Sequence, residues 1–142
     1  MRVVFSILVL LAAAGGVTAA QAQNVGQIHY IRTALDSLEA EFRNLGVQRT
    51  WWYQIATLQD DYYRDYTVTL NEAGFIAVGA DNDTLSIRIS PMENGQPDRW
   101  ESDYGTNAAS LYFNRAGTYT VRVHVEDCSA AYCYYAVMSG FR

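Results

Sequence analysis

The sequence of 142 residues contains no lysine, only two histidines, two cysteines and two prolines. All ten basic residues are therefore arginines, and fifteen acidic residues bring the net charge to −5. An acidic chain repels phosphate groups, so nucleic acid is not an expected partner. Two isolated histidines do not form a metal site, and a zinc site would need more ligands than one cysteine pair.

Long apolar runs are also missing, except at the N-terminus. Arg2 precedes an apolar run over residues 3–14, and a tract of small residues ends at Ala20, Gln21 and Ala22. This is the pattern of a cleavable secretory signal peptide, and the run is too short to span a bilayer. We therefore expect residues 1–22 to be removed and the mature chain to begin at Gln23, in the periplasm or outside the cell.

The mature chain has features of a soluble exported domain. Loss of Arg2 changes the net charge from −5 to −6. No cysteine comes directly after the cleavage point to carry a lipid, and no later run of about 18 apolar residues predicts a membrane span. About 120 residues are enough for one domain. Cys128 and Cys133 are expected to form a disulfide in an oxidising compartment.

Residues 23–48 predict one amphipathic helix before a domain over 49–142. Asn24 is a plausible N-terminal cap, and Gly46 is a plausible left-handed cap after the last turn. The apolar residues recur at spacings of three and four, which forms a narrow stripe on one face. The stripe consists of Ile28, Ile31, Leu35, Leu38, Phe42 and Leu45.

This stripe must be buried, and the sequence leaves two ways open. It either packs on the rest of the chain as a structural cover, or it pairs with the same helix of another copy or with a different protein. The segment is shorter than three heptads, which is near the lower limit for an independent coiled coil. An a/d seam this narrow suits both uses.

After Gly46 the apolar period changes to two, which predicts strands. The clearest strand covers residues 119–126, where Val121, Val123 and Val125 alternate with polar residues. Asn94 and Gly95 form a strong hairpin signal within a turn-rich segment, 91–97. The other strands are expected near residues 55–58, 66–70, 75–78, 85–90, 100–104, 110–113 and 134–138. This spacing without a second helix predicts a mainly β fold, an antiparallel sandwich or jelly roll.

The pattern resembles the bacterial pre-peptidase C-terminal domain, in its stand-alone periplasmic form, over roughly residues 54–140. The segments that carry the resemblance are 67–70, 79–83, 85–87, Gly95, Asp103, 116–123 and the cysteine turn with its aromatic strand, 128–135. The resemblance implies a jelly-roll-like β-sandwich that is a non-catalytic accessory module of secreted proteins. Some similar domains bind calcium or extracellular polymers.

The resemblance also implies a candidate calcium site. The residues that match the acidic positions of the family are Asp81, Asp83 and Asp103, while Thr84 and Ser86 stand where the family usually continues with aspartates. Calcium takes six to eight oxygen ligands, so a second acidic group would have to join this loop. Short runs of Asp and Asn also form turns without any ion. A weak calcium site and a purely structural turn both remain open, and no other cofactor is expected.

Catalysis is not predicted. His124 lies with Arg122 and Glu126 on the polar face of a strand, with no nucleophile or second histidine nearby in the sequence. The carboxylate pairs Asp60 with Asp61 and Glu101 with Asp103 are the sort that an acidic protein contains by chance.

Two dense aromatic runs are the most informative candidates for binding. They consist of Trp51, Trp52, Tyr53, Tyr62 and Tyr63. Neighbouring residues of a strand point to opposite faces, so each run must present some rings outward. Such rings can anchor a protein or stack on a sugar, or they can wedge the helix against the sandwich. We expect a non-catalytic exported binding or accessory protein that uses its helix and this aromatic junction. The alternative is a carbohydrate-binding module of the periplasm or cell surface.

Overall fold

The computed structural model of the protein describes residues 18–101 and 105–142. Residues 1–17, which include most of the predicted signal peptide, and Asp103 lie outside this range. Helix α1 (Thr18–Asn44) comes first and is followed by the strands. The strands are β1 (Arg49–Leu58), β2 (Tyr62–Leu70), β3 (Gly74–Ala80), β4 (Thr84–Glu93), β5 (Gln96–Pro97), β6 (Ala108–Phe113), β7 (Gly117–Cys128) and β8 (Cys133–Phe141).

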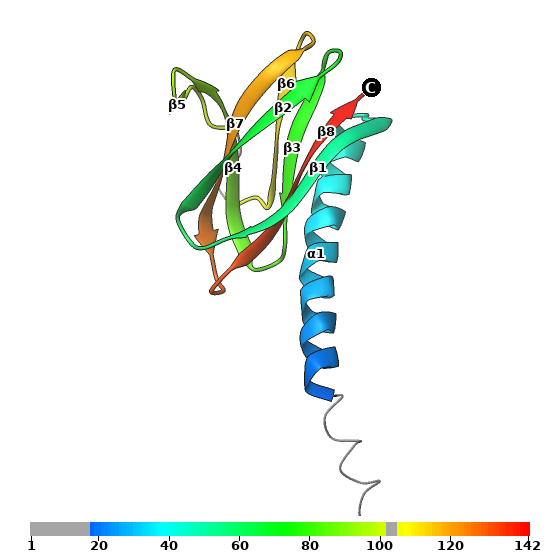
Figure 1. Ribbon diagram of the computed structural model, residues 1–142, viewed down its shortest axis with the longest axis vertical. Coiled ribbons are helices and arrows are strands. Elements are labelled where there is room, and N and C mark those ends of the chain that lie inside the picture. Colours follow the sequence, from blue (N-terminus) through cyan, green and yellow to red (C-terminus); the bar gives the residue numbers. More distant parts are fainter. Residues whose placement is uncertain (1–17, 102–104) are drawn as a thin grey trace, which may run out of the picture.

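The strands form two four-stranded antiparallel sheets, and α1 runs along the outside of one of them (Figure 1). The helix-covered sheet has the order β1-β8-β3-β6, and the other has the order β2-β7-β4-β5. The first strand pairs with the last, the second with the seventh, the third with the sixth and the fourth with the fifth. The chain is therefore one long hairpin wound between two sheets, which is the jelly-roll topology. The predicted fold class is confirmed.

The core lies between the inner faces of the two sheets. Val121, Val123 and Val125 point inward from β7, as their alternation predicted. Tyr135 is fully buried, and its hydroxyl lies 2.6 Å from that of Tyr66. Burial and this hydrogen bond raise the pKa of Tyr135 above its usual value, so the phenol stays neutral. The cluster between the sheets is thus mainly apolar, and the buried hydroxyl of Tyr135 has a partner in Tyr66.

Helix α1 packs on the outer face of the sheet through Leu38 and Phe42, which contact Phe75 of β3 and Ala136 of β8. The helix ends as predicted, because Gly46 adopts a φ of 71°. Its amide donates to the carbonyl of Arg43, and the amide of Val47 donates to the carbonyl of Phe42. This pair of bonds is the Schellman motif. The start of the helix differs from the prediction, because α1 begins at Thr18 and continues through Asn24. Alanine and glutamine fill residues 19–23, and both favour helix.

The hairpin at Asn94 and Gly95 is confirmed, with φ values of 51° and 78° in a two-residue turn between β4 and β5. The preceding segment was expected to be a turn from residue 91, but β4 continues through Pro91 to Glu93.

Two further strand details differ from the prediction. In the predicted strand 85–90, Leu85 alternates with polar residues in step with Ile87 and Ile89, which predicts that all three point inward. The structure differs, because β4 shifts its register on β7 beside Ser86 and Leu85 is exposed. Of the predicted strand 100–104, the described part forms a single bridge between Glu101 and Ile89.

Two further observations concern the predicted disulfide and the predicted lack of a membrane span. Cys128 and Cys133 form a disulfide across the β7–β8 turn, as predicted. Within residues 18–101 and 105–142, no helix has the length and apolar character needed to cross a membrane.

Candidate functional site

Helix α1 is closed against the sheet on one side by polar contacts. The amide of Asn107 donates to the hydroxyl of Ser37 at 3.1 Å. The hydroxyl of Ser110, on β6, donates to the carboxylate of Glu41 at 2.6 Å. Together with the buried Leu38, these bonds fix the helix at the β6 side of the sheet. The opposite side of the helix faces β1.

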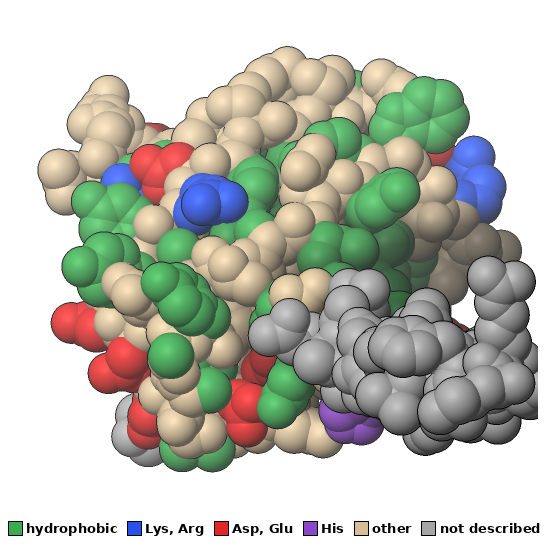
Figure 2. All heavy atoms as spheres, turned by 60° about the horizontal axis from the view of Figure 1, so that its bottom comes forward, with side chains coloured by type: hydrophobic (Ala, Val, Ile, Leu, Met, Phe, Trp, Pro, Cys, Tyr) green, Lys and Arg blue, Asp and Glu red, His purple; other side chains and the backbone are tan. Residues whose placement is uncertain are grey.

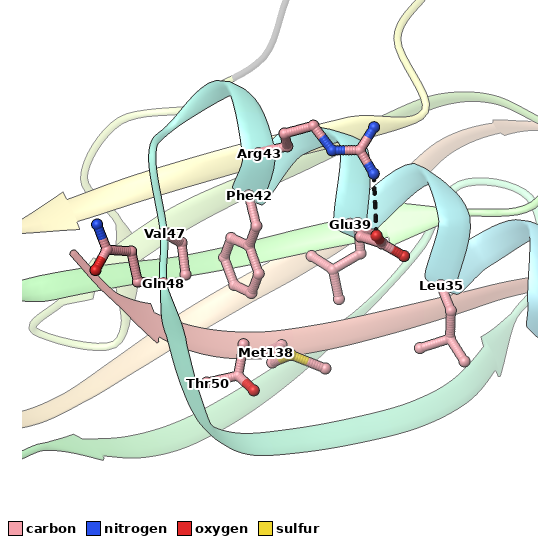
Figure 3. Close-up of a pocket in the computed structure, with 9 residues that line it drawn as sticks. Leu35, Glu39, Phe42, Arg43, Val47, Gln48, Thr50 and Met138 are labelled. Atoms are coloured by element: carbon pink, nitrogen blue, oxygen red, sulfur yellow. Dashed lines mark hydrogen bonds and ion pairs between the residues drawn. The ribbon is translucent and has the colours of Figure 1, made fainter.

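On that side an open groove of about 420 Å³ lies between α1 and β1. Figure 3 shows Leu35 and Phe42 pointing from α1 toward Met138 of β8, with Thr50 of β1 on the far side. Glu39 and Arg43 form an exposed ion pair of 3.0 Å on the helix. The groove therefore has an apolar floor and a charged rim.

Both walls of the groove leave apolar side chains uncovered. On β1, Tyr53 is paired with Met138 and Ile55 with Ala136, so these residues share the helix-covered face of the sheet. Tyr53 is 61% exposed and Ile55 is 37% exposed. On α1, Leu35 is half-buried. We call this site the α1–β1 groove. Its lining includes Leu35, Phe42, Thr50 and Met138, and Tyr53 and Ile55 are exposed beside it on the same face of the sheet.

The predicted helix stripe is divided between burial and exposure. Leu38 and Phe42 are buried on the sheet, whereas Ile31, Leu35 and Leu45 are half-buried. Ile28 is 64% exposed, and the N-terminal turns of α1 extend beyond the sandwich (Figure 1). Packing within the chain therefore covers Leu38 and Phe42 fully and Leu35 and Leu45 in part, and it leaves Ile28 largely exposed.

The aromatic residues of β1 do not wedge the helix against the sandwich, which corrects one of the two interpretations. Trp52 packs instead against the core between the sheets, with its ring 5.9 Å from that of Tyr66. Phe42 and Val47 fill the junction with the helix. The reason is a bulge in β1, because three residue steps from Thr50 to Tyr53 oppose two on β8.

The bulge leaves Trp51 as the extra residue, 71% exposed, at a second hollow of about 520 Å³. Asn71 and Glu72 of the β2–β3 turn and Arg49 of β1 line the same hollow. The guanidinium of Arg49 pairs with the carboxylate of Glu72 at 2.6 Å. We call this site the Trp51 hollow. It combines an exposed ring with the four polar side chains of Arg49, Thr50, Asn71 and Glu72.

Tyr62 and Tyr63 lie apart from both hollows. They are more than half exposed on β2, the edge strand of the other sheet. Tyr63 covers the guanidinium of Arg122, 3.8 Å from the ring centre. Asp65 holds the same guanidinium at 2.7 Å, and this hydrogen bond raises the pKa of Arg122. The five predicted aromatic residues therefore do not form one platform.

His124 lies on the predicted polar face of its strand, but its side chain is only 15% exposed. Its imidazole lies 2.9 Å from the carboxylate of Asp61, and the ring of Trp100 lies beside it. Glu126 is tied up in contacts with Ser86 and Arg88. These groups are paired with one another on the outer face of the sheet.

The end of the sandwich that carries the β1–β2, β3–β4 and β7–β8 loops is acidic, and Figure 2 shows acidic side chains among hydrophobic ones at this end. We call it the loop end, and its acidic residues are Asp60, Asp61, Asp83 and Asp127.

At this end, the carboxylate of Asp81, one of the predicted calcium ligands, is already engaged in hydrogen bonds. Asp81 is fully buried and accepts bonds from the amide and hydroxyl of Thr84 and from the amide of Tyr134. Among the described residues, no group of three or more histidine, cysteine or acidic side chains is placed to hold a metal ion. Asp81 thus serves as a structural residue, and calcium binding by Asp83 and Asp103 stays a prediction.

The sequence interpretation missed Met138 in the groove and Ile55 beside it, and it missed Arg49, Asn71 and Glu72 in the Trp51 hollow. One available signal was the set of small residues on the outer face of the sheet. Ala136 and Gly140 alternate with large buried residues on β8, which is typical of a surface on which a helix lies closely.

No family model matches the chain, and no curated protein sequence is similar to it. Among solved structures, the chain is similar to a periplasmic inhibitor of g-type lysozyme, PliG, from Aeromonas hydrophila. The identity is 9% and the TM-score 0.41, over 64% of this chain and 85% of that one. A mutant of PliG from Escherichia coli gives 12% identity and a TM-score of 0.38, over 63% and 86%. A de novo designed double-stranded β-helix gives 12% and 0.34, over 63% and 99%. Values this low carry no function from those proteins to this chain.

Proposed function

We propose that this chain is an exported, non-catalytic binding protein that holds a segment of a protein partner in the α1–β1 groove. The observation that supports this most is the position of two uncovered apolar surfaces side by side. Leu35 belongs to the helix surface, and Tyr53 and Ile55 belong to the strand surface. Neighbouring apolar surfaces that remain open on a soluble protein are typical of interaction sites.

The character of β1 adds support. It is an edge strand, and its residues 50–58 contain no charged side chain. Edge strands are usually protected by charge or by proline, because an open edge pairs readily with other chains. The bulge at Trp51 protects one end of β1 only. An uncharged edge beside an apolar groove fits a surface that is covered by a partner.

Export and the lack of catalysis belong to the same proposal. The signal-peptide pattern at residues 1–22 and the disulfide between Cys128 and Cys133 support a periplasmic or secreted location. The His124–Asp61 pair lies on the other sheet, away from the α1–β1 groove, so the proposed binding site does not use it. An accessory module similar to the pre-peptidase C-terminal domain would have these properties.

Cross-linking from the groove tests the proposal. A photoreactive benzoylphenylalanine in place of Ile55 is expected to give one discrete cross-linked product in living cells. Leu35→Asp should weaken this capture at least about tenfold, because it places a carboxylate in the apolar wall. The measurement is the yield and mass of the product after irradiation.

The matched control uses Tyr112, which is also exposed but lies on β6 at the other edge of the same sheet. The photoreactive residue at position 112 should give no discrete product, and Tyr112→Asp should leave capture from position 55 unchanged. Equal yields from positions 55 and 112, or capture that survives Leu35→Asp, would rule out the groove as the binding surface.

A second candidate function is saccharide binding, and the Trp51 hollow favours it. Sugar rings have an apolar face that stacks on indole and hydroxyls that bond to planar polar side chains. Trp51 supplies the ring, and Asn71 supplies an amide beside it. Arg49 and Glu72 neutralise each other, so the hollow suits a neutral saccharide.

Calorimetry with neutral tetrasaccharides tests this second function. Cellotetraose, maltotetraose and chitotetraose serve as probes, and at least one is expected to bind with a Kd of about 1 mM. Trp51→Ala should weaken that binding at least about tenfold by removing the stacking ring. Tyr62→Ala is the control and should bind normally, because Tyr62 lies outside the hollow. A lack of binding to all three probes at about 10 mM would exclude the site.

A further inference from the structure

Charges on the groove side of α1 match a second helix that runs in the opposite direction. Arg32 and Glu39 are both exposed and are seven residues apart, and the exposed ion pair of Glu39 with Arg43 leaves the Glu39 carboxylate accessible to a second cation. Seven residues make about two turns, so both side chains lie on the same side of the helix as Leu35. The midpoint between the two charges falls at Leu35 and Asp36. A helix with this spacing is electrostatically complementary to an antiparallel copy of itself.

We infer that the occupant of the α1–β1 groove is a second copy of this chain, whose α1 lies antiparallel to α1 of the first copy. This inference rests on the proposed function, because it names the partner of the same groove. A two-fold axis beside Leu35 and Asp36 brings Arg32 of each copy to Glu39 of the other, so the ion pair forms twice. Contacts that repeat in this way are characteristic of symmetric dimers.

The second copy also supplies the apolar side chains that the groove requires. Its Leu35 and Ile31 face Ile55 and Tyr53 of the first copy, and the reverse contacts form in the other groove. Each helix then covers its own sheet with Leu38 and Phe42 and fills the partner's groove with the remainder of its stripe. A helix lying in an apolar groove is a common mode of recognition. The arrangement covers the part of the stripe that one chain leaves open.

The distribution of charge over the whole molecule favours the antiparallel direction. The loop end carries Asp60, Asp61, Asp83 and Asp127. Arg43 and Arg142 lie at the opposite end, where α1 and β8 finish (Figure 1). Antiparallel helices place the acidic end of one copy beside the arginines of the other. Parallel helices would instead bring the two acidic loop ends together, which costs Coulomb energy.

Charge exchange at the two helix positions tests the inference. The protein is purified after export, and its mass in solution is measured by sedimentation equilibrium over about 1 to 100 µM, a range that resolves micromolar dimers. The unaltered protein is expected to be a dimer. Arg32→Glu and Glu39→Arg should each raise the dimer dissociation constant at least about tenfold, because each turns two attractions into repulsions. The double variant R32E/E39R should restore the dimer.

Two controls separate association from folding and from other charge effects. Circular dichroism should show nearly the same helix content in all variants, since both side chains are exposed and the surface ion pair of Glu39 with Arg43 contributes little to stability. Arg115→Glu reverses an exposed charge in the β6–β7 turn and should leave the dimer intact. A monomeric unaltered protein, or a double variant that stays monomeric, would overturn the inference. If position 55 still captures a different protein in that case, the proposed function stands and only the identity of the occupant is wrong.

Discussion

Replacing Gly79 by alanine is expected to force α1 away from the sheet and to lower the free energy of unfolding by about 3 kcal/mol or more. A Cβ at this position would lie 2.3 Å from the backbone nitrogen of Leu38 and 2.6 Å from its Cα. Backbone atoms cannot rotate aside as a flexible side chain does, so the helix itself must move. That movement also opens the contacts of Phe42 and widens the α1–β1 groove.

Urea denaturation followed by tryptophan fluorescence measures this effect. Gly26→Ala is the matched control, because Gly26 lies in the same helix and a Cβ there meets no atom within 4 Å. The control should be neutral or slightly stabilising, since alanine favours helix over glycine. Gly79→Ala should also reduce capture from position 55. An unchanged unfolding midpoint for Gly79→Ala would mean that α1 does not lie on β3 as described.

The fold was predictable from local pattern wherever one face of a strand is buried. Val121, Val123 and Val125 alternate with polar residues, and the structure places them in the core. The departures occur where tertiary contacts decide. Leu85 follows the same alternation, yet a register shift on β7 turns it outward, and no local signal marks that shift. Glu101 forms only a single bridge to Ile89 of β4. At that edge of the sheet, the strand paired with β4 is β5.

The candidate site was predictable in its parts but not in its assembly. The periodicity of α1 identified Leu35 and Leu38 as apolar, but their different burial depends on Gly79 and Ala136, which lie far away in the sequence. Trp51 and Trp52 are identical residues at neighbouring positions in the sequence. A bulge against β8 sends one to the surface and the other to the core, so only the pairing partner distinguishes them.

Asp81→Ala is expected to be the most destabilising single substitution considered, at about 4 kcal/mol. The Asp81 carboxylate accepts from the amide of Thr84 at 3.1 Å, from its hydroxyl at 2.9 Å and from the amide of Tyr134 at 2.8 Å. In the alanine variant the Thr84 hydroxyl and the Tyr134 amide lose this acceptor, whereas the Thr84 amide keeps the Asp81 backbone carbonyl at 3.2 Å. The site is fully buried, so water does not replace the carboxylate. The β3–β4 loop would then separate from the start of β8.

Asp81→Asn provides the matched comparison in the same urea measurement. It preserves the shape of the side chain and one acceptor oxygen, but its amide group faces a donor where the second oxygen was. The free energy of unfolding of Asp81→Asn should therefore fall between that of the unaltered protein and that of Asp81→Ala. Asp83→Ala should cost much less, because the described bonds of Asp83 with Ser129 use its backbone carbonyl.

Calcium chloride added to the same series separates the two roles of the loop. Stabilisation by calcium that disappears in Asp83→Ala would assign the ion to the half-buried carboxylate of Asp83. Equal stability of Asp81→Ala and the unaltered protein would contradict the structural role of Asp81, because a buried carboxylate with three donors cannot be removed without cost.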